Sequence, residues 1–200
     1  MNTTKQRGFT LFEMLVTLLV AGIIFGLGVP NLLEFSRNNR MAGTANDMLT
    51  AVMLARSETV KQRVPVTICT SPNPIAASPT CSPDASGTNG GYIVWVDEDE
   101  DAVVDGGETV LFQRDDPLDI TVFGNNGYVH FAANGNLADI AGEGASATQI
   151  LFCDARGNVS ASGSLSAARA LRISPTGRAE VLNEVAEIAP IVTSLGVACP

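Results

Sequence analysis

Hydrophobic residues are concentrated near the start of this 200-residue chain. Across residues 14–33, twenty consecutive residues carry no charge, and twelve of them are Leu, Ile, Val or Phe. As a helix this run is about 30 Å long, which matches the hydrocarbon core of a bilayer, and its apolar side chains cover every face. We therefore predict a membrane-spanning helix over residues 9–33, with a buried core helix as the alternative.

A helical repeat of apolar residues continues beyond this span. The repeat consists of Met41, Ala45, Met48, Leu49, Val52, Met53 and Val60. This spacing is typical of an amphipathic helix, and Pro65 cannot continue one. We predict one helix from about residue 9 to residue 62, in which residues 34–63 pack on the domain C-terminal to them. Pro30 removes a backbone donor and predicts a kink or a locally melted stretch.

Short β-rich runs separated by turn residues fill the rest of the chain. They cover residues 66–70, 92–96, 109–113, 120–123, 128–131, 149–153, 170–174 and 179–182. Ser-rich stretches at 71–88 and 160–168 are interpreted as loops. The predicted fold class is therefore α+β: a long N-terminal helix packed on an antiparallel β-sheet domain over residues 64–200.

Composition narrows the function classes. The chain has 12 Lys and Arg against 21 Asp and Glu, a formal net charge of −9. This balance argues against a general nucleic-acid binder, which needs clustered cations to neutralise phosphates. A content of 46% hydrophobic and 16% charged residues argues against disorder, and the length argues against a multidomain enzyme.

The amino terminus carries a specific motif. A short leader with Lys5 and Arg7 precedes the run Gly8-Phe9-Thr10-Leu11-Phe12-Glu13, which opens the apolar segment. This arrangement resembles the class III leader of type IV pilins and type II secretion pseudopilins. The resemblance implies that a prepilin peptidase removes residues 1–8 by cleaving between Gly8 and Phe9, and that Phe9 is then N-methylated. The basic leader predicts that the amino terminus stays cytoplasmic and that the chain after Leu33 is exported. With the resemblance, this implies a single-pass inner-membrane protein with its C-terminal domain in the periplasm.

Glu13 is the only charged residue between Phe9 and Leu33. A carboxylate in hydrocarbon costs up to about 3 kcal/mol on insertion scales, so it needs a function. By resemblance, Glu13 pairs with the terminal amine of a neighbouring subunit during filament assembly. The alternative is that Glu13 lies at the headgroup boundary.

Several further blocks are similar to the GspH/FimT family of H-type pseudopilins and minor pilins. They are residues 37–40 (RNNR), 54–61 (LARSETVK), 64–69 (VPVTIC), 91–97 (GYIVWVD) and 174–178 (SPTGR). This resemblance implies a structural subunit that initiates or caps a type IV pilus or a type II secretion pseudopilus. The implied partners are other minor and major pilins or pseudopilins, the prepilin peptidase, the inner-membrane assembly platform and inner-membrane lipid.

DNA binding is the alternative function, because some FimT proteins bind DNA through a Gly-Arg-x-Arg arrangement near the carboxyl end. Here Gly177-Arg178-Ala179-Glu180 keeps only the first arginine, so DNA is not the expected partner. Arg169, Arg172 and Arg178 are the residues that would contact DNA if they converge on one face.

Four cysteines, Cys69, Cys81, Cys153 and Cys199, lie on the predicted periplasmic side. An oxidising compartment favours disulfides, and three pairings are possible. We favour Cys69 with Cys81, closing a loop, and Cys153 with Cys199, tying the tail to a strand. Zinc is a weak rival, because the sequence contains no CxxC and only one histidine.

An acidic run, residues 97–108, comes directly after a predicted strand. Oxygen donors recur at the six EF-hand positions, supplied by Asp97, Asp99, Asp101, Val103 (through its carbonyl), Asp105 and Glu108. Calcium is therefore the one cofactor that the sequence suggests. Ala102 stands where the loop usually has glycine, and a solvated acidic hairpin is the alternative.

Candidate catalytic residues are sparse. The single histidine, His130, lies on a predicted strand without a nucleophile motif beside it, and we expect it at the surface or on an edge strand. Gly135 and Gly157 occur in turn-like contexts rather than in a phosphate-binding loop. We therefore expect a substrate of the peptidase, not an enzyme.

Overall fold

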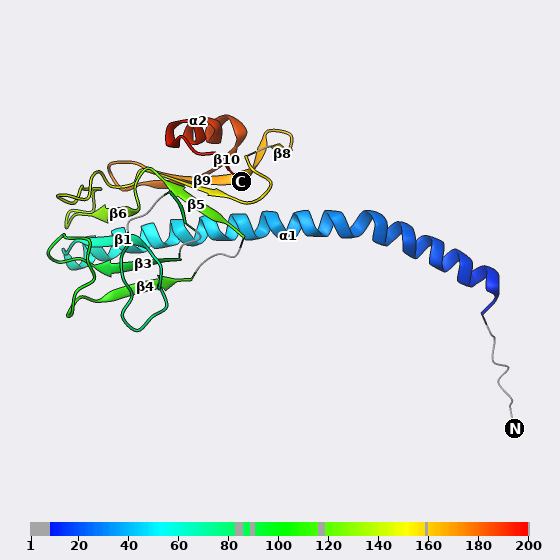
Figure 1. Ribbon diagram of the computed structural model, residues 1–200, viewed down its shortest axis with the longest axis horizontal. Coiled ribbons are helices and arrows are strands. Elements are labelled where there is room, and N and C mark those ends of the chain that lie inside the picture. The colour runs from blue at the N-terminus through cyan, green and yellow to red at the C-terminus, as the bar shows by residue number, and fades with distance from the viewer. Residues whose placement is uncertain (1–8, 83–85, 89–90, 116–118, 159, 200) are drawn as a thin grey trace, which may run out of the picture. The chain divides into compact units, whose positions relative to one another are not determined.

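The computed structural model describes residues 9–82, 86–88, 91–115, 119–158 and 160–199 (Figure 1). The chain divides into two compact units, Met1–Arg40 and Met41–Pro200. Helix α1 (Leu11–Gln62) begins in the first unit and ends in the second. The predicted single helix is thus present, starting two residues later than expected.

Residues 11–40 of the first unit are helical, and their side chains are exposed or partly exposed. Among its described residues none is buried, and the apolar side chains of Leu27, Leu32 and Phe35 are 68%, 66% and 64% exposed. α1 is long and apolar enough to cross a membrane. The helix runs through Pro30 without a break, so the locally melted stretch considered from the sequence is not present.

In the second unit α1 buries a narrow seam. The seam residues are Met41, Ala45, Met48, Ala51, Val52, Ala55 and Thr59. Steps of three and four residues place them on one helix face. Met53 and Val60 were expected in the same stripe but are 59% and 57% exposed, because they point away from that face. Arg63 ends the helix in a left-handed conformation (φ 59°), two residues before Pro65.

Two antiparallel sheets make up the β-structure. The first sheet comprises β1 (Val66–Ser71), β3 (Gly91–Val96), β4 (Val110–Arg114) and β6 (Tyr128–Phe131). The second comprises β2 (Ser86–Thr88), β5 (Thr121–Gly124), β7 (Gln149–Cys153), β8 (Ser160–Ser162), β9 (Leu165–Ile173) and β10 (Ala179–Glu184). The strand order is β4-β3-β1-β6 in the first sheet and β10-β9-β7-β5-β2 in the second, with β8 paired to β9.

The core of this unit has three parts. The largest lies between the α1 seam and both sheets, and includes Met48, Ile68 and Phe152. A second lies between the second sheet and helix α2 (Val185–Leu195), which packs through Ile188 and Ile191 (Figure 1). The third covers the outer face of the first sheet with loop residues. The seam half of α1 is therefore a central element of the domain.

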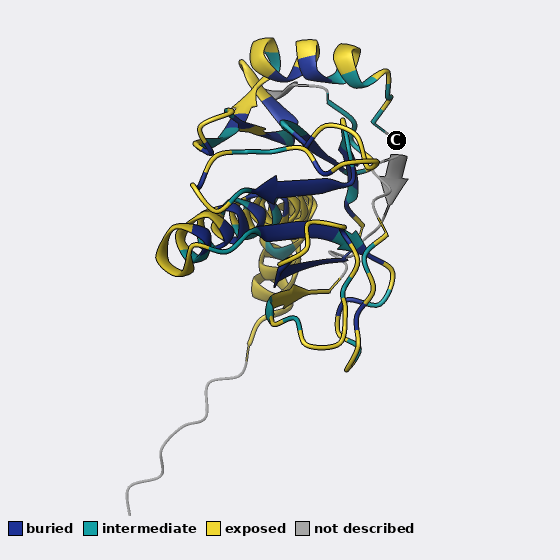
Figure 2. Cartoon of the chain, turned by 90° about the vertical axis from the view of Figure 1, so that its left-hand side faces the viewer, coloured by how far each residue is buried: buried dark blue, intermediate teal, exposed yellow. Residues whose placement is uncertain are grey.

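All eight predicted strands are present, with bounds that differ mostly by a residue or two. Three elements were not predicted: β2, β8 and α2. Two of them, together with the start of β9 at Leu165, fall in stretches that were interpreted as Ser-rich loops. Figure 2 shows α2 with an exposed outer face and buried residues toward the sheet.

Candidate functional site

The start of α1 carries the predicted assembly residue. Thr10 precedes the helix, and its Oγ1 accepts a hydrogen bond of 3.2 Å from the backbone N–H of Glu13. Thr10 is therefore the N-cap, and Glu13 lies in the first turn, where the helix dipole favours a carboxylate. Phe9 is exposed, and Gly8 lies outside the described residues. The capping pattern Thr-x-x-Glu is readable in the sequence and was overlooked.

The acidic loop connects β3 to β4 and gathers its carboxylates closely. Oxygens of Asp97, Asp99 and Glu108 lie within 4.8 Å of one another, and so do those of Asp99, Asp101 and Asp105. Five of the six predicted calcium positions thus come together, with Asp99 shared by the two groups. Burial, with repulsion from Asp97 and Asp99, raises the pKa of Glu108, and hydrogen bonds from the backbone oppose this rise.

The loop backbone arranges these side chains. Asp97 Oδ1 accepts from the N–H of Asp101 at 3.2 Å, and Asp101 Oδ1 accepts from the N–H of Val103 at 2.7 Å. The carboxylate of Glu108 accepts from two further backbone N–H groups. Ala102 adopts the left-handed conformation (φ 60°) that glycine usually supplies at the sixth position. Backbone donors therefore fix the positions of several loop carboxylates.

A buried polar cluster anchors the loop to the first sheet. Thr67, Asp97 and His130 have no exposed surface. The hydroxyl of Thr67 donates to Asp97 Oδ2 at 2.6 Å and lies 2.7 Å from His130 Nδ1. Because the hydroxyl proton is directed to Asp97, Nδ1 must donate to Thr67, so neutral His130 carries its lone pair on Nε2.

His130 Nε2 is buried without a hydrogen-bond partner among the described residues, 3.8 Å from Glu100 Oε2. Burial lowers the pKa of His130, while Asp97 and Glu100 raise it to a smaller extent. The edge-strand position expected for His130 is confirmed, since β6 ends the first sheet, but the surface position is wrong, because the side chain has no exposed surface. The backbone N–H of His130 donates to Ser146 Oγ at 2.7 Å. Since the three side chains are inaccessible, this cluster positions Asp97 rather than a substrate.

The three arginines considered for DNA do not converge. Arg169 and Arg172 are three residues apart on β9 and so face opposite sides of the sheet. Arg169 donates to the carbonyl oxygens of Ser166 and Ala168. Arg172 pairs with Glu180 at 2.8 Å, and both line a surface depression of about 390 Å³ together with Arg178. Arg172 and Arg178 therefore share one face, while Arg169 does not join them.

Two disulfides are present, Cys69–Cys81 and Cys153–Cys199, the pairings favoured from the sequence. Cys69 lies in β1 and Cys153 in β7, so each bridge ties a non-strand segment to a different sheet. The second bridge fixes the residues after α2.

Comparison with known proteins decides the family. The family described as "Type II transport protein GspH" matches residues 44–177, and the "Prokaryotic N-terminal methylation motif" matches residues 3–29. The chain belongs to the GspH family. This GspH-family chain is also similar to solved structures: two crystal forms of the type IV minor pilin FimU from Pseudomonas aeruginosa (strain PAO1).

The first form is 20% identical, with a TM-score of 0.46, and the match covers 74% of this chain and 92% of FimU. The second form is 21% identical, with a TM-score of 0.42, and the match covers 70% of this chain and 91% of FimU. Among curated proteins none matches this chain.

Proposed function

We propose that this chain is a minor pilin or pseudopilin that takes part in initiating or capping a periplasmic filament. In this proposal it is a single-pass inner-membrane protein, cleaved between Gly8 and Phe9 and methylated on Phe9. The observation that carries the proposal is the apolar surface of α1 in the first unit, interrupted by one carboxylate near its start.

This surface requires a cover that the described chain does not supply. Leu18, Ile24 and Leu27 are 69%, 62% and 68% exposed and face different sides of the helix. Apolar surface in water is unfavourable by about 25 cal/mol per Å², so lipid, and later neighbouring helices, should enclose it. A filament subunit moves from the first environment to the second.

Glu13 supplies register in this proposal. As the sole charge in the span, it is stabilised inside a helix bundle only by a cation or a hydrogen-bond donor. The terminal amine released at Phe9 is such a cation, and a neighbouring subunit presents it at the same end of the helix. Pairing the two groups neutralises both and selects one axial offset.

A filament incorporation assay tests this role. Glu13→Leu should enter the membrane and be cleaved, but should be at least about tenfold depleted from sheared filaments, since an unpaired amine remains. Glu34→Gln is the matched control, because Glu34 is the other exposed carboxylate of the first unit. Normal incorporation of Glu13→Leu, or mass spectrometry showing residues 1–8 still attached, would contradict the proposal.

A role in initiation or capping also predicts how many filaments a cell makes. Deleting the gene should reduce the number of filaments per cell while leaving the length of the remaining filaments unchanged. Immunogold label should lie at filament ends. Label distributed along whole filaments would indicate a major subunit instead.

We further propose that the acidic loop binds Ca²⁺. Two overlapping carboxylate groups and the left-handed Ala102 support this proposal, since calcium takes several oxygen ligands in a turn of this kind. Calorimetry should show uptake by the chain and at least about tenfold weaker binding in Asp99→Asn. Glu98→Gln is the control, because Glu98 stands between ligand positions. No heat from the unmodified chain would remove the proposal.

DNA binding is the alternative function. Arg172 and Arg178 line one depression, but Glu180 lies in it and pairs with Arg172. A carboxylate among the cations weakens phosphate attraction. An electrophoretic shift at low salt that disappears in Arg178→Ala would support DNA binding over a purely structural role.

A further inference from the structure

Exposure changes sharply along α1 between Phe35 and Met41. Leu33 and Phe35 are 57% and 64% exposed, whereas Met41 and Ala45 have no exposed surface. The change coincides with the boundary between the two units after Arg40. Any bilayer around the first unit must therefore end before Met41, because the domain core begins there.

Helix geometry places two arginines at that end. If residues 14–33 fill the hydrocarbon, about 30 Å, the Cα of Arg37 lies about 6 Å beyond Leu33 and that of Arg40 about 10 Å beyond. The headgroup layer extends about 5–8 Å on each side of the hydrocarbon. Both guanidinium groups are therefore within reach of phosphates.

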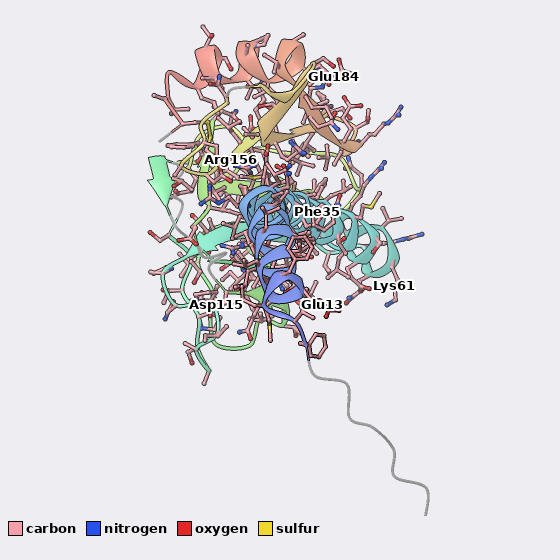
Figure 3. The ribbon with its side chains drawn as sticks, turned by 90° about the vertical axis from the view of Figure 1, so that its right-hand side faces the viewer. Glu13, Phe35, Lys61, Asp115, Arg156 and Glu184 are labelled. Carbon is pink, nitrogen blue, oxygen red and sulfur yellow. A yellow bond between two sulfur atoms is a disulfide. The ribbon has the colours of Figure 1, made fainter. Side chains whose placement is uncertain are left out.

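Side-chain direction strengthens this placement. Cα–Cβ bonds of a helix tilt toward its N-terminus, so the side chains of Arg37 and Arg40 leave the helix in the direction of the hydrocarbon boundary. Spaced three residues apart, they occupy neighbouring positions on one helix face. Both residues are exposed, and Phe35, an aromatic suited to the interface, projects from α1 just before them (Figure 3).

Charge gives a reason for cations here. Residues 41–200 contain 8 basic and 19 acidic side chains, so an anionic membrane surface repels the domain. Between Leu33 and Met41 the only charged residues are Glu34, Arg37 and Arg40. This short segment is thus the one net-positive part of the mature chain next to the predicted span.

We propose that Arg37 and Arg40 form a binding surface for the phosphodiester groups of anionic glycerophospholipids in the periplasmic leaflet. The inference rests on the proposed membrane-anchored function and adds its lipid partner. Guanidinium groups match phosphate oxygens in bidentate geometry and are weakly hydrated. Binding them fixes the depth of α1 in the bilayer until the subunit leaves for the filament.

The test uses the full mature chain in nanodiscs of equal parts phosphatidylglycerol and phosphatidylcholine, analysed by native mass spectrometry. The retained lipid should be enriched in phosphatidylglycerol by about fivefold or more, the scale expected for basic residues near an anionic surface. Arg37→Gln/Arg40→Gln should return the retained lipid to the bulk ratio. Lys61→Gln is the matched control, because it removes an exposed cation from the same helix outside the span.

Excess inorganic phosphate should leave the enrichment unchanged, because the binding surface is for lipid held in the bilayer. The inference would be overturned if free phosphate abolished the phosphatidylglycerol enrichment, or if the double variant retained as much phosphatidylglycerol as the unmodified chain. Either result would leave the membrane-anchored function standing. A mature chain that does not enter the nanodiscs would overturn both the inference and the membrane-anchored function.

Discussion

At the scale of single residues, the Thr67 hydroxyl determines which nitrogen of His130 carries a proton. Its own proton goes to Asp97, so it can only accept from Nδ1. Protonating Nε2 as well would place a cation in a fully buried site, where Asp97 and Glu100 compensate only partly. The cluster is therefore built for neutral imidazole.

Because folded His130 is neutral, the stability of the protein should depend on pH. An unfolded histidine titrates near pH 6.5, and burial holds the folded pKa of His130 lower. Below about pH 6.5 the unfolded chain takes up a proton that the folded chain does not, so stability present above that pH is lost as the pH falls toward the folded pKa.

The unmodified chain should lose up to about 1.4 kcal/mol per pH unit more than His130→Asn in this window. In that variant the amide replaces the Nδ1 donor without titrating. Urea unfolding with a chelator present measures the difference. Parallel pH profiles for the two proteins would contradict the assignment.

Gly91 is a second residue at which a substitution should clearly lower stability. A Cβ at this position would overlap the carbonyl oxygen of Arg114 and the ring of Pro74. Gly91→Ala should lower the free energy of unfolding by about 1–3 kcal/mol, because a backbone oxygen cannot move aside easily. Gly106→Ala is the control: nothing lies within 4 Å of its Cβ, so thermal unfolding should hardly change.

At the scale of elements, α1 carries one methionine inside the buried seam and another outside it. Met48 is 5% exposed and packs in the main core, whereas Met53 is 59% exposed. Met48→Ala should cost about 2–4 kcal/mol in chemical denaturation, and Met53→Ala no more than about 0.5 kcal/mol. Similar losses in both variants would mean that the buried face is assigned wrongly.

Periodicity predicted the long helix and eight strands because apolar repeats in those segments are strong. It missed α2, whose Pro190 and β-branched Ile191 and Val192 do not favour a helix. It also missed β2 and β8, three residues each with no large apolar side chain. β2 depends on pairing with β5, more than thirty residues further along the chain, which local sequence does not encode, whereas β8 forms a short hairpin with the start of β9.

Some features of the candidate sites could also be predicted from the sequence, and others could not. Local spacing was enough to predict the gathered carboxylates of the acidic loop. It left three cysteine pairings possible, of which the favoured one is present. The burial of His130 was not predictable, since its side-chain neighbours Thr67, Asp97 and Glu100 come from distant parts of the chain. The separation of Arg169 from Arg172 was readable from strand alternation once both were assigned to β9.

At the scale of the whole molecule, the second unit has its own core and both disulfides. A fragment of residues 41–200 with both disulfides formed should be soluble and should unfold in one cooperative transition. Reduction should remove about 3 kcal/mol for the 12-residue bridge and about 4 kcal/mol for the 46-residue bridge in the chain-entropy model. An aggregating or uncooperative oxidised fragment, followed by circular dichroism, would contradict this independence.

The seam of α1 also limits how the helix can change in evolution. Each inserted residue rotates the rest of the helix by about 100°, so one insertion between Ala45 and Met48 would turn half of the seam away from the sheets. Additions of about seven residues, two full turns, restore the direction. Residues 14–33 are apolar on every face, so an insertion there still presents an apolar side chain to its surroundings. Homologues should therefore vary in length one residue at a time in the span, but only by whole turns within the domain.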